Sequence, residues 1–284
     1  MAKRKGKSSS SKGAKQTRFA KKAEKSAKAP NVAKKSIRSK KYVTNEKSDA
    51  ANTGKPKSWR RRLLRYALVL IFSLALIPAL LGLLYSPHVV HPVSTLMVYN
   101  WIKGNKVDRR WVPFDKISPA LVQAVIVSED GRYCTHKGVD WGAINTIIND
   151  AIDGEKPRGA STITMQTVKN LFLWNSRSYI RKGLEVPLAL YVNVIWSKRR
   201  QLEIYLNIAE WGPGIYGIDA ASRHYFGRKA ARLSRAQVAL LAVTLPNPIL
   251  RNPNKPSRRM KILTRINRAR ARKSGAYVRC LKQG

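Results

Sequence analysis

The structural prediction for the globular part of this chain starts from residues 118–131, SPALVQAVIVSEDG. Ser118 followed by Pro119 is typical of a helix start, because serine caps a helix and proline suits its first turn. The apolar run that follows has helical spacing. We therefore predict a helix that ends in two adjacent acids, Glu129 and Asp130.

The rest of the chain after residue 86 repeats this helical character. Asp140 can cap a helix over residues 141–152, and Ser234 with Gln237 resembles a capping box ahead of residues 238–245. Further helical patterns cover residues 161–173, 182–196 and 198–209. Strand-like alternation is scarce, so we predict a mainly α domain.

Glu129 and Asp130 are unusual because a helix carboxyl end carries partial negative charge, which disfavours acids there. A functional site can justify that cost. The alternative is a solvated pair of acids at a turn.

Residues 66–85, YALVLIFSLALIPALLGLLY, carry no charge and are long enough to cross a bilayer. A buried core helix and a cleaved signal peptide are the alternatives, but the preceding basic region is too long for a signal peptide. Positive charge on the amino side predicts a single pass with the N-terminus in the cytoplasm. The rest of the chain is then extracytoplasmic, outside the inner membrane.

The chain is strongly basic, with 56 Lys and Arg against 15 acids and a formal net charge of +41. Residues 1–65 have almost nothing to bury, which predicts a disordered cytoplasmic arm, either simply solvated or attracted to anionic headgroups. We assign residues 86–256 to the globular domain and residues 257–284 to a basic tail. This tail is either a helix near the membrane or a frayed end.

Cys134 and Cys280 are the two cysteines of the chain. Two cysteines predict neither a disulfide framework nor a zinc cluster. A single bridge between them would require a proximity that sequence does not show.

Two further segments have the residue types of an anion-binding site. Residues 159–164, GASTIT, open a helix with small and hydroxylated residues, which leaves backbone N–H groups for phosphate or sugar hydroxyls. Lys169 lies further along this helix, on a face near Gln166. Arg181-Lys182-x-x-Glu185 then places a carboxylate beside two cations, which is either a surface ion pair or a clamp for a diphosphate.

Together these segments resemble the peptidoglycan glycosyltransferases (glycosyltransferase family 51). Residues 129–138 resemble the motif ED-x-x-F-x-x-H-x-G, with Tyr133 in place of Phe, and residues 159–170 resemble G-x-S-T-[IL]-T-Q-Q-x-x-K-N, with Met165 in place of the first Gln. Residues 181–185 match R-K-x-x-E, and residues 198–207 resemble K-x-x-[IL]-L-E-x-Y-L-N. The resemblance spans about residues 110–256.

The resemblance implies a lysozyme-like, mainly α domain that polymerises lipid II into glycan strands, with a lipid-linked growing glycan as donor and release of lipid diphosphate. Glu129 is then the catalytic base and Glu185 acts near the leaving group. The implied substrate-binding residues are Asp130, His136, Ser161, Thr162, Gln166, Lys169, Asn170, Arg181 and Lys182. Glu203, Tyr205 and Asn207 are treated as mainly structural.

The resemblance makes no cofactor obligatory, although a divalent cation, Mg²⁺ or Mn²⁺, at Glu185 is compatible with it. The expected partners are lipid II, the growing glycan, the inner membrane and other cell-wall or division proteins. The sequence lacks K-T-G, and its S-x-x-K lies at residues 9–12, so we expect a monofunctional enzyme.

Two other functions stay open at this point. A membrane-anchored lytic enzyme would share the fold and a catalytic glutamate but would need no diphosphate clamp. A membrane-tethered nucleic-acid-binding protein would explain the basic arm but not the motifs, and we do not expect nucleic acid as a partner.

Overall fold

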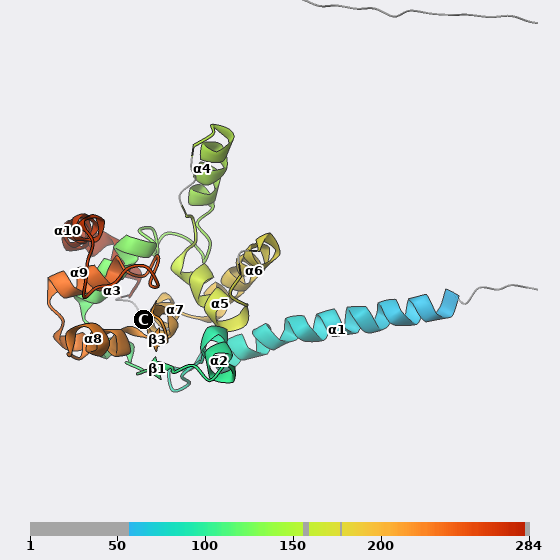
Figure 1. Ribbon diagram of the computed structural model, residues 1–284. Helices are drawn as coiled ribbons and strands as arrows, with labels where there is room; N and C mark the ends of the chain where they lie inside the picture. The colour runs from blue at the N-terminus through green and yellow to red at the C-terminus, as the bar shows by residue number, and fades with distance from the viewer. Residues whose placement is uncertain (1–56, 156–158, 177, 282–284) are drawn as a thin grey trace, which may run out of the picture. The chain divides into compact units, whose positions relative to one another are not determined.

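The computed structural model describes residues 57–155, 159–176 and 178–281. The larger part of the predicted arm, residues 1–56, lies outside them. Helices dominate the described residues, so the prediction of a mainly α fold is confirmed. The elements, labelled in Figure 1, are α1 (Lys57–Leu84), α2 (Thr95–Ile102), β1 (Asp108–Arg109), η1 (Phe114–Lys116), α3 (Pro119–Glu129), α4 (Trp141–Ile152), α5 (Ile163–Phe172), α6 (Tyr179–Ile195), α7 (Lys198–Ile208), β2 (Glu210–Gly212), β3 (Ile215–Tyr216), α8 (Ile218–Phe226), η2 (Ala230–Arg232), α9 (Arg235–Ala242), α10 (Arg258–Arg272) and η3 (Ser274–Leu281).

The helix starts agree closely with the caps read from sequence. Ser118 accepts a hydrogen bond from the Leu121 N–H at the start of α3, and Asp140 caps α4 in the same way. Ser234 and Gln237 form the predicted capping box of α9. These starts were predictable because a cap satisfies backbone donors within its own turn.

α1 contains the predicted transmembrane segment. The helix is uncharged from Tyr66 to Leu84, after four arginines in its first turns, and nearly all side chains of Trp59–Leu84 are exposed. Within the described part of the chain, this is the one helix long and apolar enough to cross a membrane.

Polar contacts fasten the carboxyl end of α1 to the helical domain. The Tyr191 hydroxyl donates to the Ala79 carbonyl at 2.6 Å, and the Trp196 indole N–H donates to the Gly82 carbonyl at 2.8 Å. Arg200 is 1% exposed and donates to the carbonyls of residues 85, 87 and 90 and to Glu203. The first residues after α1 are therefore bound to α7 by a buried guanidinium.

α7 is the central helix of the domain (Figure 1). Every residue from Arg200 to Ile208 is buried. Leu202 and Leu206 face a core built largely from α3, α8, α9 and η3, whereas Ile204 and Ile208 face a second core built largely from α5 and α6. Glu203 and Asn207, predicted to be structural, lie within this buried helix.

A small three-stranded sheet follows α7. β3 lies between β1, to which it is parallel, and β2, to which it is antiparallel. Gly217, with φ of 79°, ends the β2–β3 hairpin, and a Cβ there would approach the Asn207 carbonyl oxygen to 2.8 Å. The hairpin can therefore fold tightly back on α7.

Residues 257–281, assigned from sequence to a basic tail, form α10 and η3 and pack on the core. α10 lies against α3 and α9, and its buried Asn267 donates to the Ala124 carbonyl at 2.8 Å. η3 buries Val278 and Leu281. A frayed end is therefore wrong for α10.

Cys134 and Cys280 form a disulfide, with Cα atoms 5.5 Å apart and a sequence separation of 146. The sequence left open whether these two cysteines pair, and the structure shows that they do. Nothing local to either cysteine signals the pairing, because α10 and η3 bring the end of the chain back to the loop after α3.

Candidate functional site

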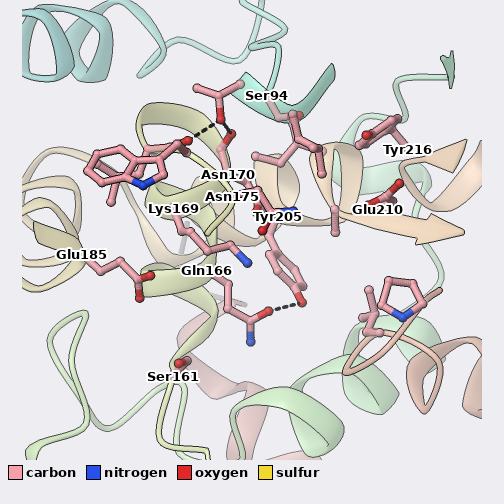
Figure 2. A pocket seen from close by; sticks show the side chains of 18 of the residues that line it. Ser94, Ser161, Gln166, Lys169, Asn170, Asn175, Glu185, Tyr205, Glu210 and Tyr216 are labelled. Carbon is pink, nitrogen blue, oxygen red and sulfur yellow. Dashed lines mark hydrogen bonds between the residues drawn. The ribbon is translucent and has the colours of Figure 1, made fainter. Parts of the chain in front are cut away.

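The predicted motifs meet at a cleft with a volume of about 500 Å³. Figure 2 shows its walls, which come from α2, α5, α6, α7 and the β2–β3 hairpin. The end of α3 and the loop after α9 complete it. The predicted site residues that line the cleft are Glu129, Ser161, Gln166, Lys169, Asn170, Arg181, Lys182 and Glu185.

Glu129 is the last residue of α3 and is partly buried at the cleft wall. Its carboxylate accepts a hydrogen bond from the Gln166 amide and another from the Ser128 hydroxyl, each at 3.2 Å. Both donors are neutral. Burial is the main cause that raises the pKa of Glu129 above the usual glutamate value, and the two hydrogen bonds offset part of that rise.

The Gln166 side chain connects Glu129 to Tyr205. The Tyr205 hydroxyl donates to the Gln166 amide oxygen at 3.0 Å (Figure 2), while the Gln166 amide nitrogen donates to Glu129. This chain fixes which way the amide faces. Tyr205, expected to be mainly structural, is buried and also lines the cleft.

Asp130, next to Glu129, points away from the cleft. Its carboxylate accepts from the Ile163 N–H at the start of α5 at 2.9 Å and bonds the His136 ring nitrogen at 2.9 Å. Asp130 therefore ties the end of α3 to the start of α5. Neither Asp130 nor His136 is among the residues that line the cleft. Both therefore support the site structurally, through contacts outside the cleft.

Thr162 also serves the scaffold. It is the N-cap of α5, where its hydroxyl accepts from the Met165 N–H and donates to the Gly138 carbonyl at 2.6 Å. The sequence suggests that the first amides of this helix are left for a ligand. Instead, the amides of Ile163 and Met165 bond Asp130 and Thr162.

The second part of the cleft is a cluster of charges on α5 and α6. Glu185 is buried, and its two oxygens bond Arg181 and Lys182, the latter at 2.7 Å. Lys182 also donates to the Ser161 hydroxyl. Three cations, with Lys169, thus face the cleft around one carboxylate.

Lys169 extends into the middle of the cleft. Figure 2 shows its amino group between Glu185 and the Gln166–Tyr205 pair. Burial lowers the pKa of Lys169, and the neighbouring cations act in the same direction, whereas Glu185 opposes them. A partly desolvated cation at this position interacts strongly with any anion that enters.

Glu185, the residue considered for a divalent cation, is surrounded by basic side chains in this structure. Both carboxylate oxygens already bond cationic side chains. In the described ranges no three His, Cys, Asp or Glu side chains gather closely enough to hold a metal ion. The positive charge near Glu185 is therefore supplied by side chains.

Glu210 and Tyr216 line the cleft but were missed in the sequence. They reach it from β2 and β3, and burial raises the pKa of the Glu210 carboxyl. The signal that singles out Glu129 could have found Glu210, since it is an acid that follows closely after a helix, α7, in a domain poor in acids. Tyr216 has no such signal.

Two of the departures from the family motifs, Met165 and Tyr133, lie away from the cleft. Met165 is fully buried in the core between α5 and α6. Tyr133 is buried, and its hydroxyl donates to the Lys198 carbonyl at 2.7 Å, so the added polar group has a partner. Neither substitution removes a group that a substrate in the cleft could contact.

Comparisons with known proteins match the same region. The family model described as Transglycosylase matches residues 96–272. A biosynthetic peptidoglycan transglycosylase of Brucella suis biovar 1 (strain 1330) is 57% identical over 224 residues, 79% of this chain and 100% of its own. Proteins of the same description from Rhizobium meliloti (strain 1021) and Agrobacterium fabrum (strain C58 / ATCC 33970) are 54% and 52% identical, over 81% and 78% of this chain and 97% and 98% of their own.

Proposed function

The chain belongs to the transglycosylase family of peptidoglycan synthesis, and on that premise we propose which residues of its cleft carry out each part of the reaction. The enzyme is a glycosyltransferase that polymerises peptidoglycan strands for the cell wall. The observation that carries the proposal is that one cleft holds both Glu129, a carboxylate hydrogen-bonded only by neutral groups, and a cluster of three cations.

In the proposed reaction, the 4-hydroxyl of lipid II attacks the anomeric carbon of the lipid-linked glycan. Glu129 takes the hydroxyl proton as the new β-1,4 bond forms, and the bond to the diphosphate breaks with inversion. A carboxylate with a raised pKa suits this role, because a stronger base takes a proton more readily. Gln166 and Ser128 hold its oxygens in place.

The departing lipid diphosphate receives the negative charge. Arg181, Lys182 and Lys169 stabilise that charge, because preorganised cations in a partly dry site favour a transition state in which charge develops on oxygen. Glu185 orients the first two of these cations by accepting a hydrogen bond from each. We therefore assign Glu185 to positioning the leaving-group site.

We also propose that α1 anchors the enzyme in the inner membrane with the cleft on the extracytoplasmic side. The basic residues that precede the span favour a cytoplasmic N-terminus. The disulfide supports the same orientation, since such bonds persist in oxidising compartments outside the cytoplasm.

The lytic and nucleic-acid-binding alternatives each leave part of the structure unused. A lytic enzyme needs no cation cluster at the cleft. Nucleic-acid binding by the arm would leave the whole cleft without a role.

The test incubates detergent-solubilised, full-length enzyme with labelled lipid II and separates the products by size. We expect long glycan that a muramidase digests. Cleavage of finished peptidoglycan without polymer formation would support the lytic alternative.

A further inference from the structure

A second groove adjoins the cleft on the side of α10. Its volume is about 270 Å³, and Pro246 lies in the walls of both cavities. Ser128 lines the groove and donates a hydrogen bond to Glu129. The groove is therefore adjacent to the proposed base, because Ser128 directly precedes Glu129 in the sequence.

The groove is lined by basic and by apolar residues. Arg251, Arg259 and Arg270 contribute guanidinium groups, while Leu263 and Ile266 contribute apolar surface. Arg251 is held in place by a hydrogen bond of 2.6 Å to the Val243 carbonyl. No acidic residue lines the groove, and within residues 57–155, 159–176 and 178–281 none of the three arginines forms an ion pair.

From these features we infer that the groove binds the carboxylate-bearing peptide of the donor sugar at the reaction centre. The inference rests on the proposed function. In a peptidoglycan precursor the peptide is attached to the same sugar whose anomeric carbon is attacked. Because Glu129 must lie next to the attacking hydroxyl, that sugar lies near Glu129, and its peptide must leave the cleft close by.

The chemistry of the groove matches such a peptide. Guanidinium groups bind carboxylates through paired, charge-assisted hydrogen bonds. Leu263 and Ile266 can pack against the methyl groups of its alanine residues. A purely phosphate-binding surface would not need these apolar lining residues.

The opposite side of α10 provides a matched control. There a separate depression of about 400 Å³ is lined by Arg235, Arg268 and Arg272 but has no residue in common with the cleft. It carries the same kind of charge without access to Glu129. If charge alone attracted the substrate or the membrane, the two sides of α10 would be equivalent.

The experiment compares two lipid II substrates, one with free peptide carboxylates and one in which these are amidated. With detergent-solubilised, full-length enzyme we expect kcat/KM to be about tenfold higher for the free-carboxylate substrate. The double variant Arg259→Gln, Arg270→Gln should lose that preference, because its kcat/KM on the free-carboxylate substrate falls. The control Arg268→Gln, Arg272→Gln should keep the preference.

Several results would overturn the inference. These are equal kcat/KM for the two substrates in the unmodified enzyme, an equal loss on both substrates in the Arg259/Arg270 variant, and an equal loss of preference in the control. If the first variant instead loses binding to vesicles rich in anionic lipid, with its substrate preference intact, the groove is a lipid-binding surface. An unmodified enzyme that polymerises neither substrate would overturn the proposed function itself.

Discussion

Glu129 and Glu185 lie in one cleft but in opposite electrostatic surroundings. Glu129 accepts hydrogen bonds only from neutral groups, Ser128 and Gln166, whereas both oxygens of Glu185 bond cations. Burial raises the pKa of Glu129, whose hydrogen bonds come from neutral donors, whereas the oxygens of Glu185 are engaged by two cationic side chains. In the proposed mechanism this difference separates the base, Glu129, from Glu185, which positions other charges.

Glu129→Gln should have the largest effect, because it removes the proton acceptor and nothing that holds the fold. We expect kcat for lipid II polymerisation to fall roughly 10²- to 10⁴-fold, with thermal unfolding unchanged. Full turnover by a well-folded variant would show that Glu129 is not the base. The proposed difference in role between Glu129 and Glu185 would then be wrong.

Glu185→Gln should lower activity less, roughly tenfold to hundredfold, but should also lower stability. It leaves Arg181 and Lys182 without their shared counter-charge, and the free energy of unfolding should fall by about 2–3 kcal/mol. Denaturant unfolding and lipid II turnover, measured on the same preparation, test both parts. A variant as stable as the parent would show that the ion pairs do not support the fold.

The pH dependence of kcat/KM should show the same division. Activity requires Glu129 without its proton, so it should fall tenfold per unit as the pH drops below the raised pKa of Glu129. It should also fall at high pH where Lys169, whose pKa is lowered, loses its charge. An acidic limb at the usual glutamate pKa would contradict the environment described for Glu129.

Removing the disulfide should affect the Glu129 side of the cleft, since Cys134 lies in the loop after Asp130. We expect Cys134→Ser with Cys280→Ser to lower the free energy of unfolding by about 2–4 kcal/mol and the rate only several-fold. Reducing agent should reproduce the change in the parent and have no further effect on the variant. Equal stability of the parent and the double variant would show that the packing of α10 and η3 on the core does not depend on the disulfide.

A chelator should have the smallest effect. Because Glu185 already bonds two cationic side chains, we expect less than about a twofold change in polymerisation when divalent ions are removed. A large loss, restored by Mg²⁺ or Mn²⁺, would show that a divalent cation takes part at the leaving-group site together with the basic side chains.

Sequence predicted what depends on neighbours in the chain. The caps at Ser118, Asp140 and Ser234 act within one turn, so the helix starts followed directly. Glu129 and Glu185 were found from their motifs, and the structure brings them to one cleft.

Features that depend on distant contacts were not predictable. Tyr216 reaches the cleft only because the hairpin folds back on α7, and Cys280 meets Cys134 only through the packing of α10. Thr162 shows the reverse case. Its residue type suits a ligand, yet the Gly138 carbonyl, 24 residues earlier, takes its hydroxyl.

The buried Arg200 has a mechanical consequence for the whole enzyme. It holds the residues that follow α1 by three carbonyl oxygens, and Tyr191 and Trp196 hold the last turns of that helix. If α1 lies in a bilayer, these contacts connect the catalytic domain to the membrane helix directly, without a flexible linker between them. The cleft then keeps a constant height above the lipid surface, and its reach is limited to substrates that diffuse laterally to it.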